Sequence, residues 1–197
     1  ISLRSRMNVL SEVGASGTDL KGILFNILKI MLSFQAILFV FLFFRFLLEY
    51  KYPLEKALGH GAFHAISAFN NAGFALYSDN MMGFARDGWI LVPVFVTVFI
   101  ASVGFPTISE VRDRALAKLA VRFGKQPKFE MPKQWSLNSR IVLWASLVLL
   151  VFGAVSIALI EWNNPNTLGP LAWYDKVLDS IFAAVMPRTA GFNSLDV

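Results

Sequence analysis

Two short apolar segments of the chain end in the same tripeptide, Ala-Gly-Phe. Residues 63–74 read FHAISAFNNAGF and residues 182–192 read FAAVMPRTAGF, with the glycines Gly73 and Gly191 lying 118 positions apart. Backbone carbonyls that converge at such a loop can replace the hydration shell of a cation. Glycine suits the position because it adopts φ values that other residues resist. The two segments therefore predict cation binding by backbone atoms rather than catalysis by side chains.

The two histidines of the chain, His60 and His64, offer a second chemistry. Their spacing places both rings on one face of a helix, but a zinc hydrolase needs a glutamate after the first histidine, and here Gly61 follows it. The rival interpretation is a polytopic membrane enzyme that uses His60 and His64. An enzyme needs acid–base or metal partners that this sequence lacks. We therefore expect that the chain is not an enzyme. Instead, His64 should pack behind the glycine loop and His60 should face the outer water.

The composition is that of a membrane protein. Hydrophobic residues make up 56% of the 197 residues and charged residues only 16%, against about 25% charged in a typical soluble domain. The charge-poor stretches predict membrane-spanning helices, the first of which, at about 1.5 Å per residue, exceeds a bilayer core of about 30 Å. Because the chain opens on Ile1, we expect it to be an internal piece of a longer protein. The expected spans are residues 23–48, 89–109 and 141–160.

Basic residues gather between the second and third expected spans, in a loop predicted at residues 110–138. This pattern marks a cytoplasmic loop, so residues 1–22 also form a cytoplasmic connector and both glycine loops face outside. Since the excess positive charge reflects topology, we expect no nucleic-acid partner. Residues 107–140 hold three acidic and eight basic side chains, the latter being Arg112, Arg114, Lys118, Arg122, Lys125, Lys128, Lys133 and Arg140.

The order of elements predicts a repeated all-α polytopic membrane protein. Residues 23–109 form one complete unit, with a pore helix at 58–70 and a filter loop at 70–74 between its two spans. Residues 139–197 form a second unit that stops after its pore helix (174–186) and filter loop (188–192). Irregular backbone at membrane depth is tolerated only where it is buried or lines a water-filled cavity. The negative end of each short helix also favours a cation. Together these features predict an ion-selectivity filter.

The segments FHAISAFNNAGF and RTAGFN, with Gly104-Phe105-Pro106 at the end of the second span, resemble the Trk/Ktr/HKT superfamily of potassium transporters, most closely the Ktr-type membrane subunit. The resemblance implies a potassium-channel-like fold of four helix–pore helix–filter loop–helix units with pseudo-fourfold symmetry in the full chain. The present chain matches the second unit and most of the third. It further implies that the filter carbonyls belong to Asn70, Asn71, Ala72, Gly73, Arg188, Thr189, Ala190 and Gly191.

The same resemblance implies which ions, which membrane and which partners belong to the protein. Potassium is the substrate and sodium an activator, both bound only at the filter, in a multi-pass protein of a bacterial plasma (inner) membrane. No covalent cofactor is expected; a nucleotide belongs to the partner, a cytoplasmic RCK-type regulatory ring, and the membrane subunit forms a homodimer surrounded by lipid. The residues expected to contact the regulatory ring are Arg112, Arg114, Lys118, Arg122 and Lys125.

The chain departs from the family pattern at two places. Met186-Pro187 precedes the Arg-Thr-Ala-Gly sequence, which predicts a reshaped end of the second short helix. The helix expected after the third filter, which acts as a gate in the family, is absent. Arg188 is left with two roles: it braces the loop by pairing with a carboxylate, or it tunes the field at the pore entrance.

Overall fold

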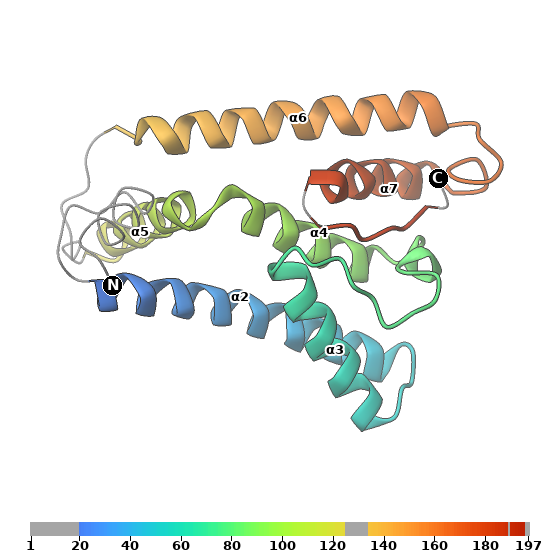
Figure 1. Ribbon diagram of the computed structural model, residues 1–197, viewed down its shortest axis with the longest axis horizontal. Coiled ribbons are helices and arrows are strands. Elements are labelled where there is room, and N and C mark those ends of the chain that lie inside the picture. Colours follow the sequence, from blue (N-terminus) through green and yellow to red (C-terminus); the bar gives the residue numbers. More distant parts are fainter. Residues whose placement is uncertain (1–19, 125–133, 189, 196–197) are drawn as a thin grey trace, which may run out of the picture. The chain divides into compact units, whose positions relative to one another are not determined.

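The computed structural model describes residues 20–124, 134–188 and 190–195 (Figure 1). Every regular element within these residues is a helix, in agreement with the expected all-α fold. The elements are α2 (Leu20–Leu48), α3 (Leu54–Phe69), η1 (Met82–Phe84), α4 (Gly88–Val103), α5 (Phe105–Arg122), α6 (Leu137–Glu161), α7 (Trp173–Val185) and η2 (Met186–Arg188), where η marks a short 3₁₀ helix.

The chain divides into two compact units. The smaller unit comprises Ile1–Leu28 with Val103–Ser146, and the larger unit comprises Lys29–Ser102 with Leu147–Val197. Both glycine loops belong to the larger unit, and the basic segment belongs to the smaller one. The two loops, although far apart in sequence, can therefore be compared within one packed body.

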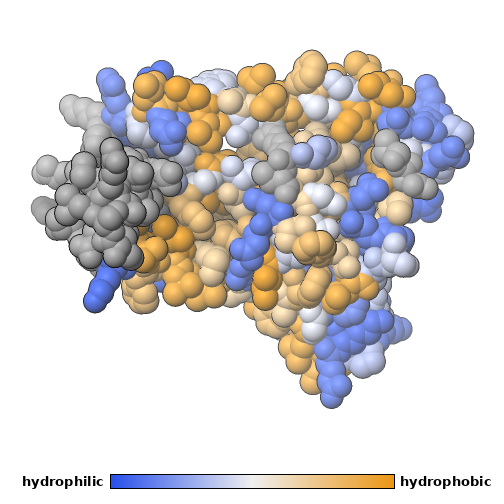
Figure 2. Space-filling model, in the orientation of Figure 1, coloured by the Kyte–Doolittle hydropathy of each residue, from blue (hydrophilic) through white to orange (hydrophobic). Residues whose placement is uncertain are grey.

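Two of the described helices are long and apolar enough to cross a membrane. They are Lys21–Leu48, within α2, and Leu137–Glu161, which is α6; α4 and α5 are long and apolar enough only when counted together. No residue in the most apolar window of α6 is buried, and Figure 2 shows hydrophobic residues over much of this helix with hydrophilic ones beyond its end. Its surface therefore suits lipid or another apolar neighbour.

The second expected span is interrupted. α4 ends at Val103, Gly104 adopts a φ of +88°, and α5 begins at Phe105 with Pro106 in its first turn, where a missing N–H costs nothing. The prediction of a span over 89–109 followed by a loop over 110–138 is wrong in two respects: the helix ends earlier, and the basic segment is helical as far as Arg122. Alanine, leucine, lysine and arginine fill this part of α5, and all four favour helix.

In the larger unit, α3 packs against α2 through small residues. Gly61 lies so close that an added Cβ would stand 3.2 Å from the backbone nitrogen of Phe43. Small side chains let two helices approach closely. Beyond this contact, Phe46 of α2 is fully buried and stacks on Tyr52, with ring centroids 5.6 Å apart. The buried small residues that share this side of α3 are Ala57, Gly61, Ala65 and Ala68.

The start of α4 is fixed by a buried carboxylate. Asp87 accepts hydrogen bonds at Oδ2 from Arg45 Nε (3.0 Å) and the Tyr50 hydroxyl (2.9 Å). Its Oδ1 accepts one from the backbone N–H of Trp89 at 3.0 Å, in the first turn of α4. Removing one partner of such a buried pair leaves an uncompensated charge, which is strongly destabilising. This network joins the ends of α2 and α4 on either side of the first glycine loop.

Candidate functional site

The first glycine loop reverses tightly at the end of α3. Asn71 has a φ of +52° and Gly73 a φ of +70°, both in the left-handed region. The N–H groups of Asn70, Asn71 and Ala72 donate to carbonyls of the last helical turn at 3.1, 3.2 and 2.9 Å. These N–H groups thus supply donors to carbonyls of the last turn of α3, which lack partners within the helix.

The carbonyl groups of this loop, unlike its N–H groups, are not paired within the described residues. Among the described residues, none donates a hydrogen bond to the carbonyls of residues 70–73. Buried or membrane-embedded carbonyls need a partner. A cation is one such partner, and oxygen ligands of this kind are what a potassium filter supplies.

Two side chains of α3 hold the chain just beyond Gly73. Ser67 Oγ donates to the carbonyl of Phe74 at 2.8 Å. His64 Nε2 accepts from the backbone N–H of Leu76 at 3.3 Å, and its Nδ1 lies 2.7 Å from the carbonyl of His60. The ring therefore carries its proton on Nδ1 and is neutral. Burial lowers the pKa of His64 to about 4, against the weaker opposing effect of the His60 carbonyl.

The histidines do not form a catalytic or metal site. His64 is fully buried with both ring nitrogens engaged, as expected of a residue packed behind the loop. His60 is half-buried, and its Nδ1 lies 2.9 Å from the Tyr77 hydroxyl. Within the described part of the chain, no three histidine, cysteine, aspartate or glutamate side chains come together as a metal site. The interpretation that His60 and His64 serve an enzyme therefore has no geometric support.

The second glycine loop follows a different helix end. α7 stops at Val185 and tightens into η2, so the expected reshaping at Met186-Pro187 is present. The N–H groups of Ala190 and Gly191 both donate to the carbonyl of Met186 at 3.1 Å. Gly191 has a φ of +68°, within 2° of the value at Gly73. Thr189 lies outside the described residues, and of Arg188 only the backbone is described.

The two loops touch. A Cβ placed on Gly73 would overlap the carbonyl oxygen of Ala190 and stand 2.6 Å from its carbonyl carbon. Ala190 is almost fully buried, whereas Gly191 is exposed. Residues that the sequence separates by more than a hundred positions are thus in van der Waals contact, and the missing side chain of Gly73 makes the contact possible.

A buried acidic residue lies on α7, the helix that precedes the second loop. Asp179 is fully buried, and neither of its carboxylate oxygens has a hydrogen-bond partner among the described residues. Burial raises the pKa of Asp179 to about 7. The nearby Ser194 hydroxyl lowers this pKa, whereas the negative charge of Asp175, one helical turn away, raises it further. Sequence reasoning missed this group, although two aspartates at a four-residue spacing in a short apolar helix are a visible signal.

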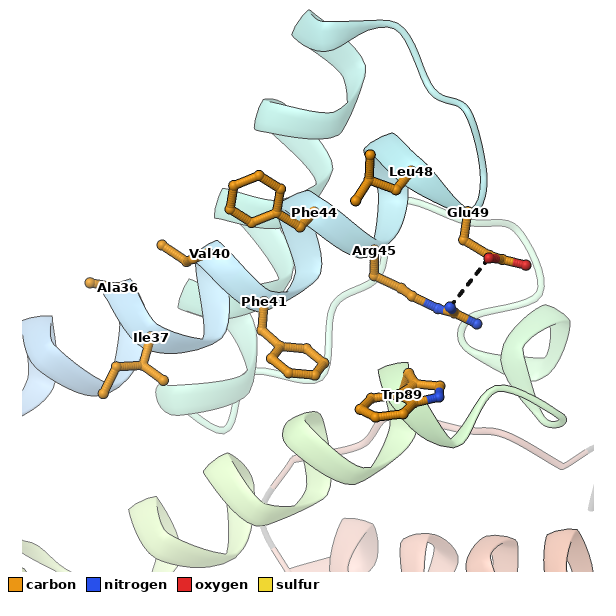
Figure 3. Close-up of a pocket in the computed structure, with 9 residues that line it drawn as sticks. All are labelled: Ala36, Ile37, Val40, Phe41, Phe44, Arg45, Leu48, Glu49 and Trp89. Carbon is orange, nitrogen blue, oxygen red and sulfur yellow. Dashed lines mark ion pairs between the residues drawn. The ribbon is translucent and has the colours of Figure 1, made fainter.

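A groove of about 790 Å³ opens on the larger unit, away from both loops (Figure 3). Arg45 and Glu49 pair across its end at 3.4 Å, and the ring of Phe41 stacks on that of Trp89. Among the lining residues, Glu49 alone carries side-chain oxygens, so the groove is a poor path for a cation. The lining residues are Ala36, Ile37, Val40, Phe41, Phe44, Arg45, Leu48, Glu49 and Trp89.

The basic residues of the smaller unit fall into two groups. Arg112 pairs with Asp113 and donates to Asn26 Oδ1 at 2.6 Å. Arg114 pairs with Glu110 at 2.9 Å, donates to the Gln134 carbonyl and lies 4.6 Å from the centre of the Trp135 ring. Both arginines are thus engaged within the chain. Lys118 and Arg122 are exposed, and Lys125 lies outside the described residues.

Comparison with known proteins gives a consistent set of matches. The TrkH family, described as cation transport protein, matches residues 10–197. The Ktr system potassium uptake protein B of Bacillus subtilis is 36% identical over 146 residues, covering 74% of this chain and 29% of its own length. The protein of the same name from Vibrio alginolyticus is 33% identical over 198 residues, covering 100% of this chain and 40% of its own.

A more distant relative is the potassium/sodium uptake protein NtpJ of Enterococcus hirae, 26% identical over 170 residues, covering 86% of this chain and 34% of its own. The chain therefore spans between 29% and 40% of the length of these three relatives.

Proposed function

Because the chain belongs to the TrkH family of cation transport proteins, we propose that it forms part of a pathway for potassium uptake across a membrane. The relatives named above are potassium uptake proteins and not enzymes, which agrees with the expectation that this chain is not an enzyme. The observation that carries the proposal is the contact between two loops, each of which follows a short helix and contains a left-handed glycine.

In the proposed mechanism, a potassium ion exchanges hydration water for backbone carbonyls. The first loop contributes the carbonyls of residues 70–73, and the second those of residues 188–191. α3 and α7 direct their partially negative ends toward the ion. Two further loops, from the remainder of a longer protein, complete a ring with pseudo-fourfold symmetry. Selection of potassium then depends on the number and position of the carbonyls.

The test uses the full-length protein in cells that lack potassium uptake. We expect Gly73→Ser and Gly191→Ser to reduce rubidium or potassium uptake and to lower the preference for potassium over sodium. Gly59→Ala is the matched control, because Gly59 lies in α3 with open space around it and an ordinary helical φ. Unchanged uptake and ion preference in both serine variants would refute the filter.

Three finer features belong to the same proposal. Sodium stimulates uptake, the membrane subunit forms a homodimer, and a cytoplasmic nucleotide-binding ring gates the pore. The excess of basic residues in the segment between α4 and α6 supports a cytoplasmic position for it, with the glycine loops outside. These features follow from the resemblance to Ktr-type subunits, and the proposal includes a position in a bacterial plasma membrane.

The side chains available for such a ring lie in the second half of α5. Lys118 and Arg122 are exposed, and no acidic residue occurs between Asp113 and the end of the helix. Leu116, 56% exposed, and Leu119, 49% exposed, lie beside them. This surface of basic and apolar side chains suits an acidic partner with an apolar centre. Arg112 and Arg114 are better explained by their partners within the chain.

A charge-reversal experiment tests this assignment. Lys118→Glu with Arg122→Glu should weaken binding of the regulatory ring in a pull-down with the full-length membrane subunit, while leaving its thermal stability near that of the wild type. Arg112→Glu with Arg114→Glu should lower the thermal stability instead. If only the second pair of changes affects ring binding, the contact lies elsewhere than on the exposed half of α5.

A further inference from the structure

The segment that follows the first glycine loop, residues 77–82, reaches the second glycine loop. The backbone N–H of Met81 donates to the carbonyl of Asn193 at 2.9 Å. The side-chain amide of Asn80 donates to the carbonyl of Gly191 at 3.5 Å, across 111 positions of sequence. We name residues 77–82 the clasp segment. Its contacts lie on the two sides of Phe192, immediately after the filter glycine.

The clasp segment is itself anchored. Tyr77 reaches back to α3, where its hydroxyl lies 2.9 Å from His60 Nδ1. Met81 is fully buried in the same hydrophobic core as Phe192. The N–H of Asn80 donates to the Tyr77 carbonyl at 3.2 Å, which closes a turn. The segment is therefore a short, folded support and not an open loop.

Asn80 suits this position for two separate reasons. Its φ is +57°, a left-handed conformation that asparagine adopts more readily than most residues. Its side chain also supplies the N–H₂ group that the Gly191 carbonyl accepts. Backbone and side-chain requirements can thus be separated by substitution, since glycine satisfies the first and not the second.

The two filter glycines differ in how they are held. Gly73 is enclosed, because Ala190 occupies the space where its side chain would be. Gly191 is exposed, and within the described part of the chain no atom other than those of its two sequence neighbours lies within 4 Å of the point where a Cβ would stand. The N–H of Gly191 is held by the Met186 carbonyl, whereas its own carbonyl accepts a hydrogen bond from the Asn80 side chain. A glycine has no side chain whose packing would fix the orientation of the following peptide group. That orientation decides where the carbonyl oxygen lies.

From these contacts we propose that Asn80 is a positioning residue for the second filter loop: its amide, with the Met81 N–H, sets the orientation of the peptide groups at Gly191 and Asn193. This inference rests on the proposed function, in which the Gly191 loop lines the ion path. In this arrangement, the clasp segment of the first unit positions the carbonyl groups of the second unit. Ion preference therefore depends on a residue outside both filter loops.

The test measures potassium and sodium uptake by the full-length protein in cells that lack potassium uptake. Asn80→Gly keeps the left-handed backbone and removes the amide, and Asn80→Asp keeps the shape but replaces the donor by an acceptor. Losing one hydrogen bond corresponds to a change of about two- to tenfold. We expect the potassium-to-sodium ratio to fall by about that factor in Asn80→Gly and further in Asn80→Asp, with the maximal rate for potassium changing less. Asn163→Gly, at an exposed asparagine after α6, is the matched control.

The outcomes separate the inference from the function on which it rests. If Gly73→Ser alters the ratio and both Asn80 variants leave it at the wild-type value, the clasp is overturned and the filter stands. If Gly73→Ser and Gly191→Ser also leave the ratio unchanged, the filter fails and the clasp fails with it. If Asn80→Asp reaches the membrane in too small an amount to measure, Asn80→Gly decides alone, because its backbone is unstrained at this φ.

Discussion

Gly73 and Gly191 share a backbone conformation but differ in what a side chain would meet. Alanine at either position costs about 1–2 kcal/mol for the left-handed φ. At Gly73 the new methyl group also collides with the Ala190 carbonyl, whereas at Gly191 the space is open. We therefore expect Gly73→Ala to lower the unfolding temperature of the purified full-length protein more than Gly191→Ala. Equal losses in the two variants would contradict the contact between the loops.

His64 makes stability depend on pH in a defined direction. Its pKa is about 4 in the folded chain against 6.5 for an ordinary histidine. Between these values the unfolded chain takes up a proton that the folded chain does not, so stability is full above about pH 6.5 and falls as the pH drops toward 4. His64→Gln should show a smaller loss of unfolding temperature between pH 7.5 and 5 than the wild type. His60→Gln, at a half-buried ring, is the control and should keep most of the pH dependence.

Asp179 makes stability depend on pH in the opposite direction. Its pKa is about 7 in the folded chain against an ordinary value of 3.8, so the folded state retains its proton longer. Its contribution to stability is full below about pH 4 and is lost as the pH rises through 7. Asp179→Asn should therefore raise the unfolding temperature at pH 7.5, with the gain shrinking toward pH 4. Asp79→Asn, at an exposed carboxylate, should change little at either pH. A destabilised Asp179→Asn at pH 7.5 would mean that the carboxylate has a cationic partner in the full protein.

At the level of elements, Glu110 fastens the start of α6 to α5. Its carboxylate accepts hydrogen bonds from the Ser136 N–H (3.0 Å) and hydroxyl (2.7 Å). Ser136 in turn accepts from the Ser139 N–H at 3.2 Å, as a helix N-cap does. Glu110→Ala leaves these donors and Arg114 without their acceptor, so we expect a loss of about 1–3 kcal/mol in unfolding free energy. Thermal or denaturant unfolding of the full-length protein measures it.

The comparison for this prediction is Asp113, one turn further along α5. Its ion pair with Arg112 involves side chains that are 35% and 36% exposed. An exposed pair contributes about 0–1 kcal/mol. Asp113→Ala should therefore cost much less than Glu110→Ala, and a reversed order would show that α6 is held in place by other contacts.

The two short helices are defined by how they end. α3 closes in an ordinary turn through Asn70, whereas α7 narrows into η2 before its loop. The first loop is then fastened by side chains of its own helix, Ser67 and His64, and the second by the clasp segment of the preceding repeat. Loops of similar sequence are thus held in their conformations by different means.

At the scale of the whole molecule, the described residues include many large apolar side chains that are exposed. α6 alone carries exposed side chains such as Trp144 (67%) and Leu159 (78%). The relatives are more than twice as long as this chain. Lipid or another apolar protein surface is the neighbour that such a surface requires.

Local sequence patterns determined much of the secondary structure of this protein. Apolar runs and their lengths identified α2 and α6 as spans and α3 and α7 as helices too short to cross, because burial in lipid is read directly from hydrophobicity. The two Ala-Gly-Phe loops were visible because left-handed backbone selects glycine. The helical continuation to Arg122 was missed because the basic residues of this segment were interpreted as those of a cytoplasmic loop.

Only the tertiary structure decided which distant groups meet. The contact of Gly73 with Ala190 and the hydrogen bond from Asn80 to Gly191 have no signature in spacing. Hydropathy and glycine act over a few residues, whereas these contacts depend on how helices pack across a hundred positions of chain. The sequence determined that two glycine loops of similar sequence exist; the packing determined that they touch and which groups hold each one in place.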